Sequence, residues 1–190
     1  MTAWPGERAL HGGADAIPLT RGAHLLGEPA GVEQVPGALW LCGKHFVGPD
    51  PEAALRRVGA TTVVCLCQRH ELASRYPDYV TWLRDNQPDR ALWSPIPDLG
   101  VPAEVERDEL LGGLVDRLAA GEGLLLHCGA GLGRAGTLAA ALLVVLGFEA
   151  AEASAVVAAH RPMAGPQSLE QAEWLAEGSF PTTEAQRGLP

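Results

Sequence analysis

The stretch GLLLHCGAGLGRAGTLAAALLVVLGF, residues 123–148, decides the fold. It opens with GLLLHC, a predicted strand at 123–128, and passes through a loop with glycines at 129, 131, 133 and 136. An apolar helix is predicted next, over 134–146. Because neither the strand nor the helix has a polar face, we expect both to be buried. A buried strand, a glycine-rich loop and a buried helix in this order indicate a parallel sheet with helices on both faces.

The rest of the chain continues this alternation of strands and helices. Asp50 is a predicted N-cap, Pro51 stands at the first helical position, and Gly59 ends that helix. Further strands are predicted at 38–43, 61–67 and 91–96, and further helices at about 77–87, 105–119, 149–160 and 167–177. The sequence therefore predicts an α/β fold, with a central, mainly parallel sheet flanked by helices on both faces.

The 190 residues are enough for one domain with a sizeable core, and they contain no internal repeat. Residues 1–36 are rich in glycine and proline without a sustained period, so we expect an irregular arm that packs on the domain. The domain is predicted over 37–178, and residues 179–190 have the composition of a loose tail.

Charge and cysteine usage exclude several classes of protein. A net charge of −9 and a pI near 5.1 argue against nucleic acid or an anionic membrane surface as the main partner. The longest apolar run is too short to span a bilayer, and residues 1–36 lack the features of a secretory signal. Four scattered cysteines do not form a disulfide framework. We therefore expect a cytoplasmic protein with free thiols.

The loop after the strand has the composition of an anion-binding site. Its glycines permit a tight ring of inward-facing N–H groups, and the start of the helix adds partial positive charge. The same field favours the thiolate form of a cysteine at Cys128, and the planar fork of Arg134 can bind two phosphate oxygens. The predicted phosphate-binding residues are Gly129, Ala130, Gly131, Leu132, Gly133 and Arg134.

His127, Cys128, five residues and then Arg134 resemble the signature loop of the cysteine-dependent protein tyrosine and dual-specificity phosphatases. Gly131 and the Gly136–Thr137 pair match as well. The alternative is a glycine-rich turn around a buried, inert cysteine. The resemblance implies a phosphatase domain over 37–178 that works through a phosphocysteine at Cys128, with His127 and Thr137 in supporting positions and with no metal or cofactor.

Two other segments resemble the same family. SPIPDLGVP, roughly thirty residues upstream of the loop, implies that Asp98 is the general acid. The other reading of Asp98 is a cap of the helix after Pro102, with Asp108 as the next candidate acid. RPMAGPQSLEQAEWL implies that Gln167, or failing that Gln171, positions the attacking water.

The segment CQRHEL, residues 67–72, together with PIPDLGVP looks like the kinase-associated phosphatase subgroup, the cyclin-dependent kinase inhibitor 3-like enzymes. The resemblance covers roughly residues 38–177. It implies that Cys67 lies behind the catalytic loop, where it could form a reversible disulfide with Cys128 under oxidant. Cys65 lies deeper and is the less suitable partner, and the alternative for Cys67 is a packed core residue.

Ala135 departs from the family pattern. Most members have serine or threonine directly after the arginine, where the hydroxyl helps the thiolate to leave the phosphoenzyme. Ala135 lacks that hydroxyl, so we expect slower breakdown of the intermediate. The same departure favours a rival function, a pseudophosphatase that only binds phosphorylated partners.

Other residues and functions carry less weight. Cys65, Cys67 and His70 form a weak metal pattern without a fourth ligand, and His160 and Arg161 are expected to cap a helix end. Rhodanese-like sulfurtransferases and arsenate reductases share a Cys…Arg loop but do not need the acid loop. Since no lysine stands in the phosphate loop, phosphoinositides are disfavoured. A phosphorylated protein or peptide is the expected partner, with phosphotyrosine and phosphoserine or phosphothreonine as substrates.

Overall fold

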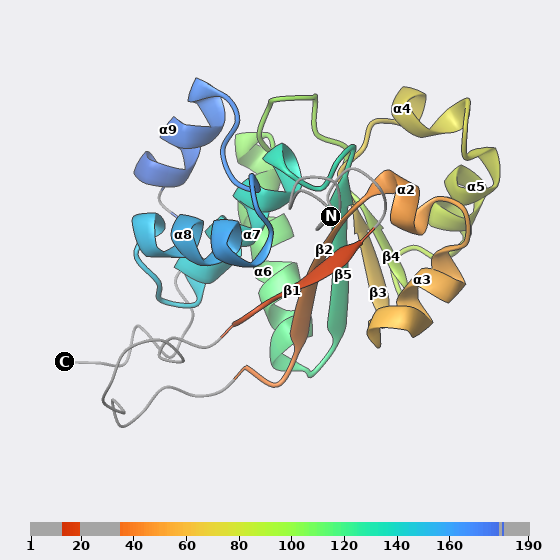
Figure 1. Ribbon diagram of the computed structural model, residues 1–190, viewed down its shortest axis with the longest axis horizontal. Helices are drawn as coiled ribbons and strands as arrows, with labels where there is room; N and C mark the ends of the chain where they lie inside the picture. Colours follow the sequence, from red (N-terminus) through yellow and green to blue (C-terminus); the bar gives the residue numbers. More distant parts are fainter. Residues whose placement is uncertain (1–12, 20–34, 179, 181–190) are drawn as a thin grey trace, which may run out of the picture.

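The computed structural model describes residues 13–19, 35–178 and 180. Its core is a five-stranded sheet in the order β1-β2-β5-β3-β4 (Figure 1). The strands are β1 (Ala14–Ile17), β2 (Ala38–Gly43), β3 (Thr62–Cys65), β4 (Ala91–Trp93) and β5 (Gly123–Cys128). All neighbouring pairs are parallel except β1 and β2, which are antiparallel. The mainly parallel sheet predicted from the sequence is confirmed.

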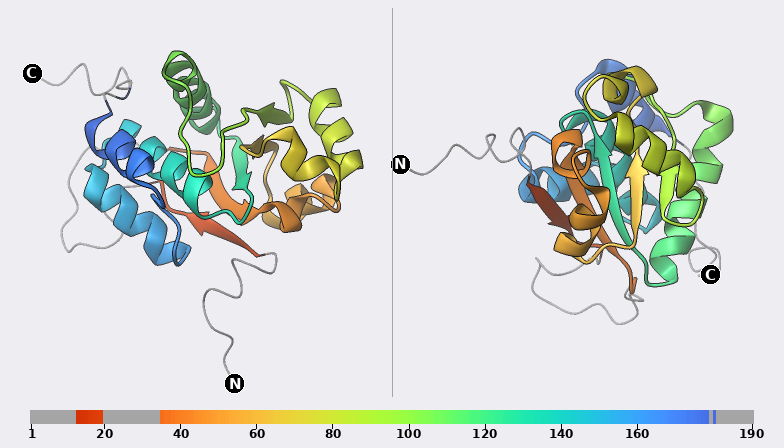
Figure 2. Two further views of the ribbon diagram at one scale, coloured as in Figure 1. Left: turned by 90° about the horizontal axis from the view of Figure 1, so that it is seen from above. Right: turned by 90° about the vertical axis from the view of Figure 1, so that its right-hand side faces the viewer.

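Helices cover both faces of the sheet, as Figure 2 shows from two further directions. One face carries α6 (Glu104–Ala119), α7 (Gly133–Val145), α8 (Ala150–His160) and α9 (Leu169–Glu177). The other carries α2 (Lys44–Val47), α3 (Pro51–Val58), α4 (Arg69–Ala73) and α5 (Pro77–Asp85). The predicted three-layer α/β architecture is therefore confirmed.

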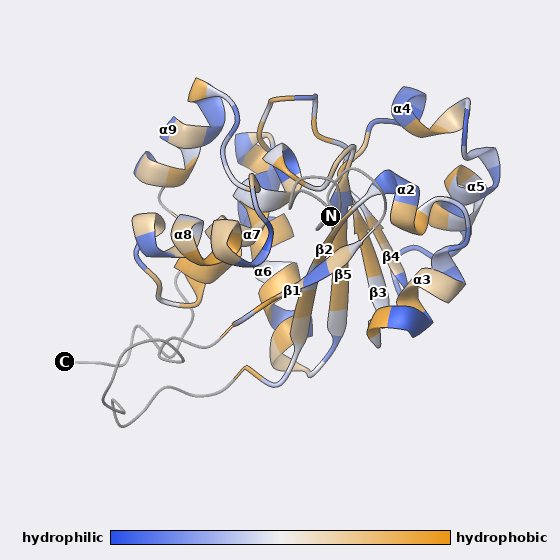
Figure 3. Ribbon diagram, in the orientation of Figure 1, coloured by the Kyte–Doolittle hydropathy of each residue, from blue (hydrophilic) through white to orange (hydrophobic). Residues whose placement is uncertain are grey.

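The strand side chains alternate between the two cores. In β5, Leu124 and Leu126 pack with the α6–α7 face, whereas Leu125 packs on the α3–α5 face. In Figure 3 the central strands are apolar along most of their length. A strand with helices on both sides has no face for water, which is why its sequence is apolar throughout. No helix in residues 13–19, 35–178 and 180 is long and apolar enough to cross a bilayer.

Local signals placed most helix boundaries correctly. The Asp50 side chain accepts a hydrogen bond from Ala53 N at 2.9 Å, Pro51 opens α3, and Gly59 ends it with a left-handed φ of 72°. Asp50 acts through its side chain, and Pro51 and Gly59 act through their backbone preferences, so all three signals are local and can be read from the sequence.

The structure differs from the sequence analysis at three places. Ala14–Ile17, expected within an irregular arm, form an edge strand whose four residues are too few to leave a period in the sequence. The helices α2 and α4 have four and five residues, fewer than a periodic pattern needs. The strands predicted at 61–67 and 91–96 end early, at Cys65 and Trp93. Apart from Phe180, the predicted tail lies outside the described residues.

Candidate active site

Cys128 lies at the carboxyl end of the central strand β5. It is the last residue of that strand, pairs in register with Gly43 of β2, and is only 3% exposed. The loop 129–132 then leads into α7, which begins at Gly133. A ligand at this edge of the sheet therefore meets the thiol, the loop and a helix N-terminus together.

The carbonyl groups of the loop all point outward. Each of the four accepts a hydrogen bond from a donor outside the ring. Gly129 O accepts from Lys44 N (3.0 Å), Ala130 O from Arg161 Nη2 (2.9 Å), and Gly131 O from Arg161 Nε (2.7 Å). Leu132 O accepts from Gly136 N (2.9 Å) and Gly165 N (3.2 Å). A trans peptide directs its N–H opposite to its C=O, so the following N–H groups face the inside. Within the described part of the chain, the N–H groups of residues 129–134 donate to no other protein group.

Only glycine fits at the tightest point of this loop. Gly131 has a φ of 75°, and a Cβ added there would overlap the backbone carbonyl of Cys42 in the neighbouring strand β2. The left-handed conformation and the close approach each exclude a side chain. The loop is therefore held tightly against the sheet.

Arg134 is buried at the inner end of the loop, with its side chain 3% exposed. Its Nη1 and Nη2 atoms donate to the two carboxylate oxygens of Glu71 at 2.7 and 2.8 Å, and Nη1 also reaches Leu66 O and Ile96 O. The Nε–H is buried and is the one buried side-chain donor without a partner in the described chain. A buried, unpaired donor of this kind is suited to bind a ligand.

Glu71 fixes the orientation of the Arg134 fork. Burial opposes ionisation of the Glu71 carboxyl, but hydrogen bonds from Arg134 and from Gln68 N hold its pKa below the usual range. Burial likewise disfavours the charged guanidinium, yet the bonds to Glu71 raise the pKa of Arg134. The pair is therefore ionised on both sides, in the bidentate geometry that aligns a guanidinium with a carboxylate.

Asp98 lies over the mouth of the loop. Its Oδ1 is 3.2 Å from Arg134 Nη2, while its side chain stays 78% exposed. Two side chains at the start of α9 hold the acid loop in place, because Ser168 Oγ donates to Leu99 O and Gln171 Nε2 donates to Gly100 O. The helix cap predicted as an alternative role for Asp98 is not formed, since α6 starts after Ala103 without a side-chain cap.

Asp108, the second candidate for the acid, is exposed in α6, where it pairs with Arg107 at 2.7 Å. The two candidate glutamines have different surroundings. Gln167 is exposed, and its Oε1 lies 2.9 Å from where a Cβ on Gly133 would stand. Gln171 is fully buried, accepting from Gln167 N and Thr137 Oγ1 and donating to the acid loop.

His127 is buried under the loop on the α5 side of the sheet. Its Nε2 is 2.6 Å from Tyr79 Oη, and its Nδ1 is 3.3 Å from Cys128 O. Ala135 is fully buried in the first turn of α7. His127 therefore lies against the start of the loop, and Ala135 lies in the helix that follows it.

The cysteine pair considered as a metal pattern meets a different histidine from the one expected. The Cys65, Cys67 and His127 ligand atoms lie within 4.8 Å of one another, whereas His70 is exposed in α4. Hydrogen bonding to Cys65 and burial raise the pKa of the Cys67 thiol. Cys67 packs with the α3–α5 core and Cys128 with the α6–α7 core. The disulfide between them stays a prediction.

Sequence analysis missed two residues that hold the site together. Glu71 stands in CQRHEL, a segment noted only for its family resemblance, and that segment was the available signal. Arg161 is the C-cap residue of α8, as expected, but its fully buried side chain also binds the phosphate loop, which was not expected. No local pattern marks a buried arginine, because its partners are 30 or more residues away in the chain.

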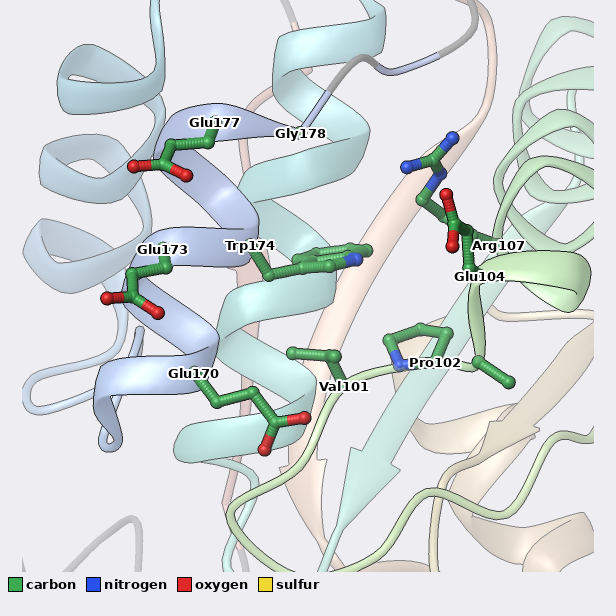
Figure 4. Close-up of a pocket in the computed structure, with 10 residues that line it drawn as sticks. Val101, Pro102, Glu104, Arg107, Glu170, Glu173, Trp174, Glu177 and Gly178 are labelled. Carbon is green, nitrogen blue, oxygen red and sulfur yellow. The ribbon is translucent and has the colours of Figure 1, made fainter.

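A pocket of about 680 Å³ adjoins the acid loop on its C-terminal side (Figure 4). Trp174 of α9 projects into it toward Arg107 and Glu104 of α6, with Val101 and Pro102 along one edge. None of the predicted site residues lines this pocket. The pocket therefore lies between the start of α6 and α9, apart from the predicted site residues.

Comparison with solved structures supports the same architecture. A kinase-associated phosphatase with its catalytic-site cysteine replaced by serine is 24% identical, with a TM-score of 0.68 over 87% of this chain and 92% of that one. Tk-PTP in its active form is 25% identical (TM-score 0.59; 81% and 99% covered). A human tyrosine phosphatase-like serine/threonine/tyrosine-interacting protein is 22% identical (TM-score 0.60; 73% and 89% covered). A search of the curated proteins found no match.

The family itself follows from a match to a family model. Residues 35–188 match the model described as "PTP-SAK: Swiss Army Knife protein, DSP-PTPase phosphatase domain", which spans nearly all of the described core. The chain therefore belongs to the dual-specificity and tyrosine phosphatase family, as a cysteine-dependent phosphatase whose fold resembles that of the kinase-associated phosphatase.

Proposed function

We propose that the protein hydrolyses phosphorylated proteins or peptides through a phosphocysteine intermediate at Cys128. The observation that carries this proposal is the ring of inward N–H groups at residues 130–133, together with the buried, unpaired Nε–H of Arg134. These donors surround the end of the strand that carries the thiol. Donors fixed in advance around a transferring phosphoryl group supply much of the rate enhancement in such reactions.

The reaction takes place in two displacements. Cys128 Sγ attacks phosphorus and the bond to the leaving oxygen breaks, while Asp98 gives that oxygen its proton. Water then attacks the phosphocysteine, Asp98 takes a proton from it, and the thiolate leaves with release of inorganic phosphate. Gln167 positions this water, a role supported by its exposure and its place beside Gly133.

Arg134 couples binding of the phosphoryl group to placement of the acid. Its Nη1 is saturated by Glu71 and backbone carbonyls, and its Nη2 is shared with Asp98 at 3.2 Å. A phosphoryl group held by Nε and Nη2 competes with the Asp98 carboxylate for Nη2. Because Asp98 is largely exposed, it can move from that bond toward the leaving oxygen without breaking the core.

The expected substrates are phosphotyrosine and phosphoserine or phosphothreonine in a protein. Ala130 and Leu132 give the loop no extra cation for a second phosphate, which disfavours phosphoinositides. All four cysteines are free, which supports work in a reducing compartment such as the cytoplasm. No role for nucleic acid, membrane, metal or cofactor is proposed.

A phospho-binding pseudophosphatase is the second candidate. The observation that favours it is Ala135, a buried methyl group where a hydroxyl would help the phosphoenzyme break down. Binding and turnover separate the two candidates. Steady hydrolysis of p-nitrophenyl phosphate, lost in Cys128→Ser, excludes the pseudophosphatase.

Cys128→Ser and Arg134→Lys should each abolish turnover, but by different routes. Serine leaves the cradle intact and removes the thiolate, so tungstate, a tetrahedral oxyanion, should still bind. Lysine keeps the positive charge and loses the planar fork, so tungstate binding should weaken as well. Calorimetric titration with tungstate beside an assay of aryl phosphate hydrolysis tests this. Near-normal turnover in Cys128→Ser contradicts the mechanism.

Asp98→Ala should lower turnover and strengthen oxyanion binding at the same time. The variant loses the proton donor, which is worth roughly 10²–10⁴-fold in kcat for poor leaving groups and much less for p-nitrophenol. It also removes a carboxylate that competes for Arg134 Nη2. Hydrolysis of phosphoserine peptides against p-nitrophenyl phosphate, with tungstate titration, measures both. If both substrates are hydrolysed at the parent rate, the acid lies elsewhere.

Glu71→Gln should lower kcat/KM by roughly 10²-fold. The substitution displaces the Arg134 guanidinium, and the bound phosphoryl group moves with it out of the geometry that the reaction needs. The amide puts N–H₂ against one guanidinium nitrogen and breaks the bidentate pair. Glu52→Gln is the matched control. Glu52 forms the same two-point pair with Arg90, at an exposed position that includes none of the site residues. Equal effects of the two substitutions on kcat/KM, assayed on p-nitrophenyl phosphate, count against a positioning role for Glu71.

Ala135→Ser should raise the steady-state rate if breakdown of the phosphoenzyme limits the parent. Rapid mixing of the parent with p-nitrophenyl phosphate should then release a burst of p-nitrophenol before steady turnover. The burst should shrink in Ala135→Ser and Ala135→Thr as the second step becomes faster. With neither a burst in the parent nor a gain in the variants, the missing hydroxyl has no kinetic consequence.

A further inference from the structure

Arg161 is the largest side chain that is fully buried in the described chain, and the proposed reaction does not use it. Burying a guanidinium is unfavourable unless its N–H groups are bonded and its charge is paired. Nε and Nη2 donate to the carbonyls of Gly131 and Ala130 at 2.7 and 2.9 Å, and Nη1 donates to Asp15 Oδ2 at 2.6 Å. This arginine therefore joins the phosphate loop to β1.

The two carbonyl bonds set the direction of two donors in the cradle. When Ala130 C=O points outward to Arg161, the planar trans peptide turns the N–H of Gly131 inward. The bond to Gly131 C=O turns the N–H of Leu132 inward in the same way. One side chain outside the cradle thus holds two peptide units that would otherwise be free to rotate.

Asp15 in turn holds Arg161. It lies on the edge strand β1, in register with Leu41 of β2, and its carboxylate is 23% exposed. Arg161 Nη1 also lies 3.3 Å from Leu41 O, so the guanidinium crosses from β1 to the loop beside the end of β2. A charge-assisted bond to a carboxylate on a paired strand fixes where the fork can sit.

We propose that Arg161 and Asp15 are positioning residues for catalysis: Asp15 on β1 orients Arg161, and Arg161 holds the loop so that its N–H groups face the phosphoryl group. The proposal rests on the function proposed above. It gives β1, a strand that the sequence analysis placed within an irregular arm, a role in oxyanion binding. Arg161 and Asp15 act through the loop and do not touch the substrate.

The chain contains a matched control. Arg117 also donates to two backbone carbonyls, Pro88 O at 2.7 Å and Asp89 O at 3.2 Å, and to one carboxylate, Glu122 at 2.9 Å. Arg117 stands in the last turn of α6, and its partners precede β4 and β5, so this clamp lies at the amino ends of the strands, at the sheet edge opposite the phosphate loop. Its substitution therefore reports the loss of an arginine clamp as such, without an effect on the cradle.

The experiment compares Arg161→Lys, Asp15→Asn and Arg117→Lys with the parent. Lysine cannot place one cation against two carbonyls and a carboxylate, so Arg161→Lys should lower kcat/KM for p-nitrophenyl phosphate by roughly 10²-fold. Its tungstate affinity should fall in parallel. Asp15→Asn keeps an oxygen acceptor and loses the charge, so a loss of about fivefold in both is expected. Arg117→Lys should lower only Tm.

The double variant tests whether the two residues act as one unit. If Asp15 works through Arg161, adding Asp15→Asn to Arg161→Lys should cost no further tungstate affinity. Should Arg161→Lys fail to fold, Asp15→Asn alone decides, because its carboxylate is partly exposed and its replacement has the same shape. Parent-like tungstate affinity and kcat/KM in Asp15→Asn, or losses no larger than those of Arg117→Lys, overturn the proposal.

Failure of this inference can be told apart from failure of the proposed function. Tungstate binds the cradle whether or not the thiol turns over, so its affinity reports the oxyanion site independently of catalysis. A parent protein without turnover, but with tungstate affinity that falls in Asp15→Asn and Arg161→Lys, rejects the phosphatase and retains the positioning role. An active parent whose tungstate affinity is unchanged in both variants rejects the positioning role and retains the phosphatase.

Discussion

The site depends on one constraint, that the peptide groups of the loop 129–132 turn their carbonyls outward. A planar peptide cannot present its C=O and its N–H on the same side, so each outward bond creates one inward donor. The outward bonds come from four places: α2 through Lys44 N, Arg161 at the end of α8, the first turn of α7, and Gly165 N in the segment between α8 and α9. The cradle is thus built by the surroundings of the loop as much as by its own glycines.

The distinction between a segment's own residues and its surroundings also separates what the sequence could predict from what it could not. Asp50, Pro51 and Gly59 act within a few residues of themselves, so their pattern was enough to place α3. The phosphate loop was equally legible, because its thiol, glycines and arginine stand within seven consecutive positions.

Long-range partners were the part that the sequence could not supply. Glu71 is 63 residues from Arg134, and Asp15 is 146 residues from Arg161. Glu71 is the only acidic residue of a five-residue helix, and Asp15 is the only one of a four-residue strand. In the sequence, neither differs from an ordinary exposed acidic residue. The roles proposed for them follow only from the fold, which brings a buried guanidinium to each. For the same reason the sequence indicated the position of Arg161 at the end of α8 but not the bonds of its side chain.

Arg134 and Arg161 divide two tasks that a single arginine could not perform. Arg134 faces the inside of the loop, and its Nε–H has no partner, so it is available to a phosphoryl group. Arg161 lies outside the loop, and its N–H groups donate to backbone carbonyls and to Asp15. Each guanidinium has a carboxylate partner, which leaves the backbone N–H groups and the start of α7 as the main source of uncompensated positive potential. Under the proposed function, such a cradle selects one tetrahedral oxyanion by geometry and adds little long-range attraction for anions in a protein of net charge −9.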